Sequence, residues 1–361
     1  MPLIDIRNLV TAFHTPAGRV PAVDGVSLAL DRGRTLGLVG ESGSGKSVTA
    51  MSVLGLVAAP GVIESGEILL EHRGTTTNLV GLPEPQLRKV RGGRVGMIFQ
   101  EPMTSLNPVF TVGDQVAEAV RLHRDVTREA ARARALEMFR LVRLADPELR
   151  LDEYPHQLSG GMRQRVMIAM ALACEPELVI ADEPTTALDV TIQAQILDLL
   201  ADLRRRLGTA ILLITHDLGV VAETCDEVAV MYAGKIVERA PADELFSRPL
   251  HPYTIGLLAA KPHPEGDRRG PLRTIPGMVP PPQHFPRGCR FHPRCGYARL
   301  GGRPGAQTAG KAGPPEAQAC DAVLPELREL SPGHFVRCHY AGELGAPARD
   351  EAALARDGGA A

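Results

Sequence analysis

The stretch GESGSGKS, from Gly40 to Ser47, carries residue types that can hold the phosphates of a nucleotide. It matches the pattern G-x-x-x-x-G-K-[ST] and lies between an apolar run and a segment with helical spacing. Glycines let backbone N–H groups turn inward around phosphates, the lysine reaches the terminal phosphates, and the next hydroxyl can bind Mg²⁺. A glycine-rich turn that only caps a helix is the alternative. The residues expected to bind nucleotide are Gly40, Ser42, Gly43, Ser44, Gly45, Lys46 and Ser47, the last also as a Mg²⁺ ligand.

A second stretch, LVIADE from Leu178 to Glu183, ends an apolar run with two adjacent carboxylates. Asp182 at the end of a buried strand can hold Mg²⁺ through water, and Glu183 can polarise an attacking water as general base. A pair of acids at a strand end can also be a solvated turn. The phosphate-binding pattern in the same chain favours the catalytic interpretation.

A covered parallel sheet is needed to position these residues, and the apolar runs predict one. The short runs typical of strands covered on both faces read TLGLVG, LVIADEP and AILLITHD, and helix-length segments separate the last two. An antiparallel sheet is expected to open the chain, from IDIRNLV, the turn TPAG, PAVDGVSLAL and SGEILLE. A later hairpin is expected to turn at Ala233-Gly234.

Helical spacing appears in two parts of the sequence. The first, Ser47 to Val57, follows the phosphate-binding pattern. The second runs from Val112 to Leu144, with Thr127 as the expected N-cap, and predicts a helical insertion over about residues 101–157.

The stretch QLSGGMRQRVMIAMAL, from Gln157 to Leu172, resembles the signature motif of ABC transporter ATPases. Other family motifs lie in family order around it: FQ with Gln100, ADEPTTALD with Asp189, and THD with His216. The resemblance covers roughly residues 2–258. It implies an α/β fold with a P-loop NTPase (RecA-like) core, an antiparallel β subdomain and a helical insertion.

Residue roles follow from this resemblance. It implies that Gln100 contacts Mg²⁺ and the lytic water, that His216 contacts the γ-phosphate, and that Asp189 organises the dimer interface. The small residues Ser159, Gly160 and Gly161 would open a helix, an anion-binding position, and face the phosphate loop of a second subunit. The resemblance thus implies a head-to-tail dimer with ATP between subunits. Phe13 is the candidate to stack on adenine, and core filling is its alternative.

Three further stretches resemble the ATPases of dipeptide and oligopeptide permeases: EPMTSLNPVFTVGDQVAE, HPYTIGLLAA and GCRFHPRC. The resemblance implies an ATPase that drives peptide import through two membrane-spanning permease subunits. Its other partners would be a second ABC ATPase, related or identical, and, indirectly, an extracytoplasmic substrate-binding protein. The chain would then lie peripherally at the cytoplasmic face of the membrane. Nickel or another small solute is the alternative cargo, and a soluble ABC ATPase acting on DNA or ribosomes the alternative function.

Four cysteines lie near the C-terminus: Cys289, Cys295, Cys320 and Cys338, with 5, 24 and 17 residues between them. This spacing differs from the paired C-x-x-C knuckles of zinc ribbons. The resemblance implies a 4Fe-4S cluster, for which four thiolates are the right ligands. Zn²⁺ is the alternative, with His292 or His339 as substitute ligands. Cys174 and Cys225 lie in apolar segments and are expected to be ordinary buried cysteines.

Composition sets the remaining expectations. The 361 residues carry a formal charge of −2, so nothing in the composition supports binding to nucleic acid. The N-terminus lacks the features of a signal peptide, and no apolar run reaches the roughly 20 residues of a membrane-spanning helix. Eight prolines between Pro262 and Pro286 predict a loop-rich connection to a small module. The expected domains are 1–260, the ATPase; 261–340, the cysteine-containing module; and 341–361, a disordered tail.

Overall fold

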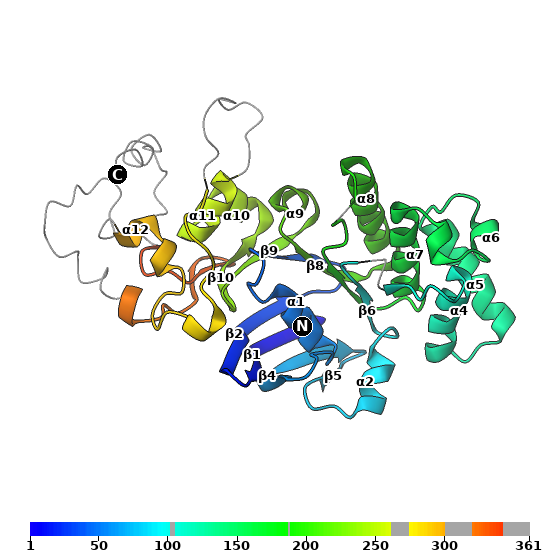
Figure 1. The fold of residues 1–361 in the computed structure, drawn as a ribbon, viewed down its shortest axis with the longest axis horizontal. Helices are drawn as coiled ribbons and strands as arrows, with labels where there is room; N and C mark the ends of the chain where they lie inside the picture. The colour runs from blue at the N-terminus through cyan, green and yellow to red at the C-terminus, as the bar shows by residue number, and fades with distance from the viewer. Residues whose placement is uncertain (102–104, 187, 261–273, 300–319, 342–361) are drawn as a thin grey trace, which may run out of the picture.

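The computed structural model describes residues 1–101, 105–186, 188–260, 274–299 and 320–341 (Figure 1). All of the predicted tail except Ala341 lies outside these residues, as does the first half of the proline-rich connection. In Figure 1 the strands occupy the centre of the molecule, a group of helices lies at one end, and the described residues from 274 onward lie toward the other.

A four-stranded antiparallel sheet opens the chain, as predicted. Its strands, in spatial order, are β2 (Gly18–Leu30), β1 (Ile4–Thr15), β4 (Gly61–His72) and β5 (Thr75–Asn78). The strands β1 and β2 join through the predicted turn, where Thr15 pairs with Gly18. The short helix α2 (Glu84–Val90) follows this sheet.

The second sheet contains eight strands and carries the predicted parallel core. Its strands, in spatial order, are β11 (Arg328–Ser331), β12 (His334–Val336), β10 (Lys235–Pro241), β9 (Glu227–Tyr232), β3 (Thr35–Val39), β8 (Ala210–Thr215), β7 (Leu178–Asp182) and β6 (Val95–Ile98). The five strands from β9 to β6 are parallel, and every residue of β3, β7 and β8 is buried. Continuous apolar runs therefore form these strands because both faces are covered.

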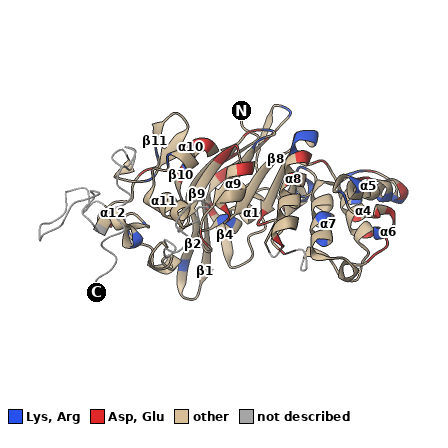
Figure 2. Ribbon diagram, turned by 90° about the horizontal axis from the view of Figure 1, so that it is seen from above, with Lys and Arg blue, Asp and Glu red and all other residues tan. Residues whose placement is uncertain are grey.

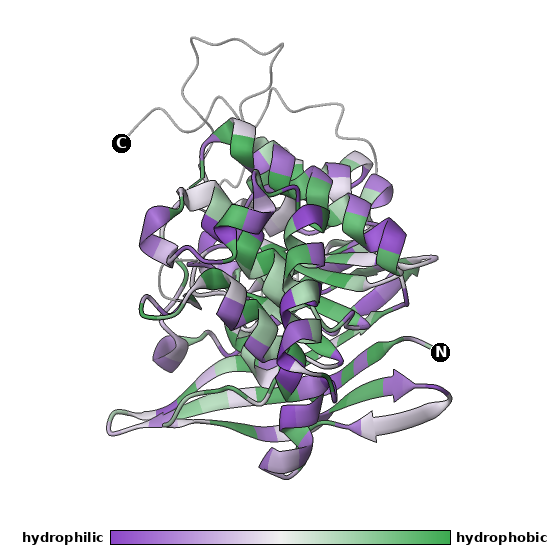
Figure 3. Ribbon diagram, turned by 90° about the vertical axis from the view of Figure 1, so that its right-hand side faces the viewer, coloured by the Kyte–Doolittle hydropathy of each residue, from purple (hydrophilic) through white to green (hydrophobic). Residues whose placement is uncertain are grey.

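Helices cover the parallel strands, and buried apolar residues gather on both faces of the sheet. One cluster joins the large sheet to α1 (Lys46–Val53) and the antiparallel sheet, and the other contains residues of the later helices. Those helices are α4 (Val112–His123), α5 (Arg128–Leu141), α7 (Gly160–Leu172), α8 (Val190–Leu207), α9 (Leu218–Thr224), α10 (Ala242–Ser247) and α11 (Pro252–Ala259). The short helix α6 (Pro147–Arg150) contributes no buried residue. Figure 3 views the molecule from the end where α4, α5 and α7 lie, and shows hydrophilic and hydrophobic residues alternating along the helices there.

The helical insertion is confirmed as α4 and α5, packed against α7. Thr127 caps α5 as predicted, because its side chain accepts a hydrogen bond from the N–H of Ala130 at 3.2 Å. Lys, Arg, Asp and Glu are interspersed over these helices (Figure 2). None of the helices in the described part of the chain combines the length and apolar character that crossing a membrane requires.

Two details differ from the sequence predictions. The helix after the phosphate loop ends at Val53 instead of Val57, because Gly55 turns the chain with a φ of 60°. The C-terminal segment is not only loops: besides short helical turns (Pro282–His284, His292–Arg294, and α12, Gly296–Arg299), it adds β11 and β12 to the large sheet. The hairpin of β9 and β10 turns at Ala233-Gly234 as predicted.

Candidate active site

The phosphate loop connects β3 to α1, as the mechanism requires. Gly40, Gly43 and Gly45 have φ values of 155°, 77° and 107°, which allow backbone N–H groups to turn inward. The ammonium of Lys46 is buried beneath the loop and donates to the carbonyls of Gly40 at 2.8 Å and Glu41 at 3.0 Å. These carbonyls hold the lysine where incoming phosphates would meet it.

Replacing Gly45 with alanine is expected to destabilise the protein by about 2 kcal/mol or more and to abolish nucleotide binding. The added Cβ would lie 2.3 Å from the carbonyl oxygen of Ala22, so the loop must move. Urea unfolding and nucleotide titration measure both effects.

Gly43→Ala is the matched control, because a Cβ there meets nothing within 4 Å. It should cost only the left-handed backbone strain, about 1–2 kcal/mol. Equal losses in the two variants would show that close packing at Gly45 is unimportant.

Five of the predicted site residues converge beside this loop. The hydroxyl of Ser47 donates to Asp182 Oδ1 at 3.1 Å, next to the end of β7. Gln100 Nε2 donates to Glu183 Oε2 at 3.0 Å, and His216 Nδ1 lies 3.3 Å from Glu183 Oε1. Parallel strands bring these groups together, because β6, β7 and β8 all end at the same side of the sheet.

The charges of this centre perturb two pKa values. Burial lowers the pKa of Lys46, against the opposing effect of Glu183, Asp182 and Glu41. Burial and the neighbouring Glu183 raise the pKa of Asp182, against the Ser47 hydrogen bond and Lys46. Additional positive charge beside Asp182 would therefore favour the ionised form of its carboxyl group. The oxygens of Ser47 and Asp182 suit Mg²⁺, whose coordination shell water and phosphate oxygens would complete.

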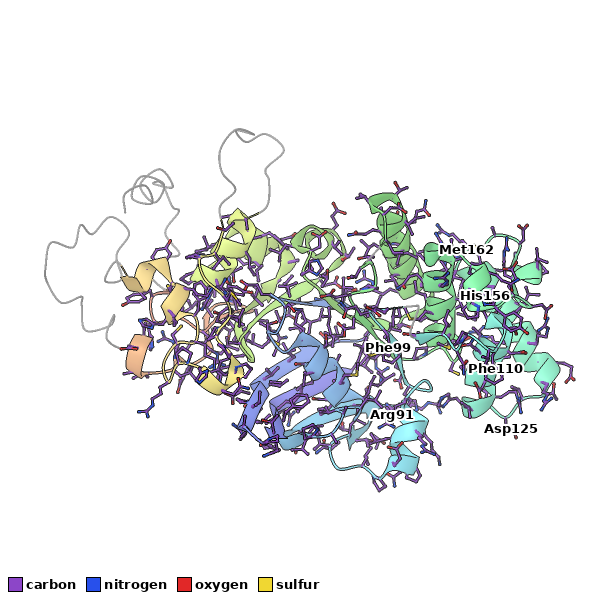
Figure 4. All side chains as sticks on the ribbon, in the orientation of Figure 1. Arg91, Phe99, Phe110, Asp125, His156 and Met162 are labelled. Carbon is purple, nitrogen blue, oxygen red and sulfur yellow. The ribbon has the colours of Figure 1, made fainter. Side chains whose placement is uncertain are left out.

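An open cleft leads to this centre. It is lined by Ser47, Met51, Phe99, Gln100, Glu101 and Asp182, among others. Figure 4 places Phe99 near the middle of the molecule, whereas Phe110, His156 and Met162 lie over the helical end. Ser47 and Met51 belong to α1, and Phe99 and Gln100 follow β6 directly, so the cleft lies between α1 and the segment that follows β6.

The signature residues lie apart from the phosphate loop of their own chain. Ser159 caps α7 by accepting from the N–H of Met162 at 3.3 Å, and it is exposed together with Gly160. In Figure 1, α7 lies with α4 and α5, away from α1. Gly161 packs near Ile192, and the exposed Asp189 caps α8 through the N–H of Ile192. This arrangement leaves the helix N-terminus open to a group from outside the chain.

Phe13 lies on β1, half-buried, beside Gly61 of β4. Its ring therefore packs partly against the antiparallel sheet and is partly exposed to solvent. The sequence analysis missed three residues that contact the site: Thr186, whose hydroxyl donates to Glu183 at 2.9 Å, Glu41 and Tyr253. All three lie within sequence stretches quoted above, but a motif match does not predict which side chains these residues contact.

The four C-terminal cysteines gather at one place. The N–H of Cys289 donates to the carbonyl of Cys320 at 2.8 Å, and Cys289 packs in apolar clusters with Cys295 on one side and with Cys320 and Cys338 on the other. Burial raises the pKa of the Cys289 thiol to about 11, that of Cys320 to about 12 and that of Cys338 further. Proximity to other cysteines adds to these three shifts.

As a donor set, four gathered sulfurs suit a thiolate-ligated group. Within the described residues, however, no three His, Cys, Asp or Glu side chains form a group that could hold a metal ion. The four cysteines therefore match such a group in ligand type and in location, but their side chains are not arranged in a coordination geometry. Cys174 and Cys225 are buried, as predicted.

Comparisons with known proteins agree with the fold and with the family resemblance. A family model described as "ABC transporter" matches residues 23–186, and one described as "Oligopeptide/dipeptide transporter, C-terminal region" matches residues 237–300. A Sinorhizobium fredii protein named "Probable peptide ABC transporter ATP-binding protein" is 52% identical over 95% of this chain and 96% of its own length. Oligopeptide transport ATP-binding protein AppD of Bacillus subtilis is 48% identical over 95% of this chain and 98% of its own.

Solved structures confirm the predicted α/β fold. A dimeric structure of an ATP-binding cassette bound to ADP and Pi superimposes with a TM-score of 0.58 at 28% identity, covering 66% of this chain and 98% of that one. A component of an ABC transporter complex from Clostridium perfringens gives 0.58 at 26% identity, covering 68% and 91%. The chain therefore belongs to the ABC transporter ATP-binding proteins of the oligopeptide/dipeptide type.

Proposed function

We propose that this chain hydrolyses ATP at the phosphate loop and thereby drives peptide import through separate membrane subunits. The observation that carries the proposal is the convergence of Ser47, Gln100, Asp182, Glu183 and His216 beside Lys46. The relatives are named as ATP-binding proteins of peptide transport, which supports the cargo class.

Each residue has a distinct role in this mechanism. Lys46 and the inward-turned backbone N–H groups bind the phosphates. Ser47 and Asp182 would hold Mg²⁺, which would neutralise charge on the phosphate oxygens. Glu183 accepts the proton of the attacking water as general base. Gln100 and His216, both in contact with Glu183, orient that water and the γ-phosphate.

The second half of the site comes from another subunit. Ser159, Gly160 and Gly161 would bind the γ-phosphate on the phosphate loop of the partner, and Asp189 would lie at that interface. Ser159, Gly160 and Asp189 are exposed at the N-terminal ends of α7 and α8, away from the phosphate loop of their own chain, which supports a head-to-tail dimer. The partner is a second copy or a related ATPase, and Phe13 is proposed to stack on adenine.

The helical insertion is proposed to contact the two permease subunits at the cytoplasmic face of the membrane. Exposed apolar side chains between the cleft and α4 support this position, with Val109 and Phe110 exposed by 70% and 55%. An extracytoplasmic substrate-binding protein would act through those subunits.

Reconstitution tests the function. The chain is assembled with its permease subunits and ATPase partner in proteoliposomes, and ATP hydrolysis and peptide uptake are measured with the binding protein and short peptides. Peptide uptake that requires ATP supports the proposal. ATP hydrolysis that is stimulated by nickel complexes but not by peptides would assign nickel as the cargo. Copurification of the chain with ribosomes or DNA in place of the permease subunits would overturn the transport role.

We further propose that Cys289, Cys295, Cys320 and Cys338 hold a 4Fe-4S cluster. Beside Cys289, a small cavity is lined by Lys235, Arg290 and Arg337. The Asp24 carboxylate pairs with Lys235 and Arg290, and the Glu326 carboxylate interacts electrostatically with Arg337. Arg337 lowers the pKa of Cys289 in opposition to burial. These cations would offset the negative charge of a thiolate-ligated centre, whereas burial alone keeps the pKa of the Cys289 thiol high.

Protein purified without oxygen is expected to contain about four irons per chain and to absorb broadly near ~400 nm. Iron, acid-labile sulfide and zinc are measured together with the visible spectrum. Cys338→Ser should lose most of the iron, whereas Cys174→Ser, at a buried cysteine in the helical half, should keep it. About one zinc per chain without iron would make the module a zinc site.

A further inference from the structure

The segment between Cys289 and Cys295 reaches from the C-terminal module to the phosphate loop. Arg294 Nη1 lies 3.0 Å from Glu41 Oε2, although the two residues are 253 positions apart. Glu41 is the second residue of the GESGSGKS loop. The C-terminal module therefore contacts the loop directly.

Arg294 is fixed by more than this ion pair. Its side chain is only 6% exposed, Nε donates to the carbonyl of Pro276 at 2.9 Å, and Nη1 lies 3.4 Å from the hydroxyl of Tyr232. A buried guanidinium is costly unless a carboxylate compensates its charge, and Glu41 supplies that carboxylate. The ion pair is thus built into the packing and is not an exposed surface contact.

Glu41 is also held through its backbone. Its N–H donates to the hydroxyl of Tyr253 at 2.9 Å, and its carbonyl accepts from the ammonium of Lys46 at 3.0 Å. Tyr253 packs on Tyr232 and Phe291, with ring centroids 4.6 Å and 5.4 Å apart, and Phe291 lies in the same segment as Arg294. One segment therefore supports both the side chain and the backbone of Glu41.

We propose that Arg294 is a positioning residue for the phosphate loop, which neutralises and orients Glu41 and thereby sets the affinity of the loop for ATP. The inference rests on the proposed role of the loop in ATP binding. Without Arg294, an uncompensated Glu41 carboxylate would lie on the loop that receives the phosphates and would compete with them for Lys46. Binding should weaken, while Glu183 and the other groups around the attacked phosphate stay in place.

Binding of AMP-PNP with Mg²⁺ to the full-length protein tests this, measured by calorimetry alongside thermal unfolding. Arg294→Gln is expected to raise the Kd about three- to tenfold. Removing both charges in Glu41→Gln/Arg294→Gln should return the Kd to within about twofold of the parent. A purely structural role for Arg294 would instead leave the double variant as weak as the single one, which would overturn the proposal.

Arg287→Gln is the matched control, because Arg287 lies in the same module but is exposed, and its Kd should not change. If Arg294→Gln does not fold, Arg294→Lys keeps the charge without the planar fork and should show a smaller rise in Kd. An unchanged Kd in the folded Arg294 variants, or an equal rise in Arg287→Gln, would overturn the inference. Failure of the parent protein itself to bind AMP-PNP would overturn the proposed function instead.

Discussion

Glu183→Gln is expected to lower the rate of ATP hydrolysis at least ~10²-fold while nucleotide still binds. The amide has the size of the carboxylate but cannot accept a proton from the attacking water. Glu183 lies within 3.3 Å of both Gln100 and His216 and has a φ of 47°, so the fold holds it in an unfavourable backbone conformation beside these two groups. Phosphate release and Mg²⁺-nucleotide titration measure the two effects separately.

The control for this variant is Glu223→Gln, at an exposed glutamate of α9. Its hydrolysis rate should match that of the parent protein. Turnover that is unchanged in Glu183→Gln would assign the general base to another group. A joint loss of binding and turnover would mean that Glu183 supports the phosphate loop and not the attacking water.

Glu238→Ala is expected to destabilise the protein by about 3–5 kcal/mol, the largest loss of stability among these variants. Glu238 on β10 is completely buried. Its carboxylate pairs with three groups: the N–H of Leu250 at 2.7 Å, the N–H of His251 at 3.0 Å and Nε2 of His334 at 2.8 Å. Removing the carboxylate leaves these buried groups without their partner. Chemical denaturation of the full chain measures the loss.

His334 belongs to β12, so this cluster also joins the C-terminal module to the ATPase core. Hydrogen exchange should therefore accelerate in β12 of the Glu238→Ala variant. The control is Glu329→Ala on β11, whose exposed carboxylate accepts from the N–H of Gly333 at 2.8 Å; its stability should stay close to that of the parent. A loss below about 1 kcal/mol in Glu238→Ala would show that water replaces the carboxylate.

Much of the ATPase core could be predicted from the sequence because its signals are local. The strands β3, β7 and β8 are apolar throughout, and the chemistry lies in short motifs at their ends. Motif order places Ser47, Asp182, Glu183 and His216 at one side of the sheet, since parallel strands align their carboxyl ends.

Contacts between distant segments could not be predicted in this way. The pairing of Arg294 with Glu41 and of His334 with Glu238 depends on how the C-terminal segment folds back on the core, and nothing in HPRC or GHFV specifies a partner. The β11–β12 hairpin has strands of four and three residues, too short for a clear alternation of polar and apolar positions. The family resemblance likewise implied four cysteine ligands, but the sequence did not indicate how these cysteines are arranged in space.

The pairing of β12 with β10 has a consequence for self-association. Arg337 donates its N–H to the carbonyl of Val237, and Glu238 and Arg239 pair with Val336 and Phe335. A chain shortened to residues 1–260 would expose β10 as an unprotected edge strand, which can pair with another molecule and start aggregation. The pairing of β12 thus covers an edge of β10 that would otherwise be open to pairing with another molecule.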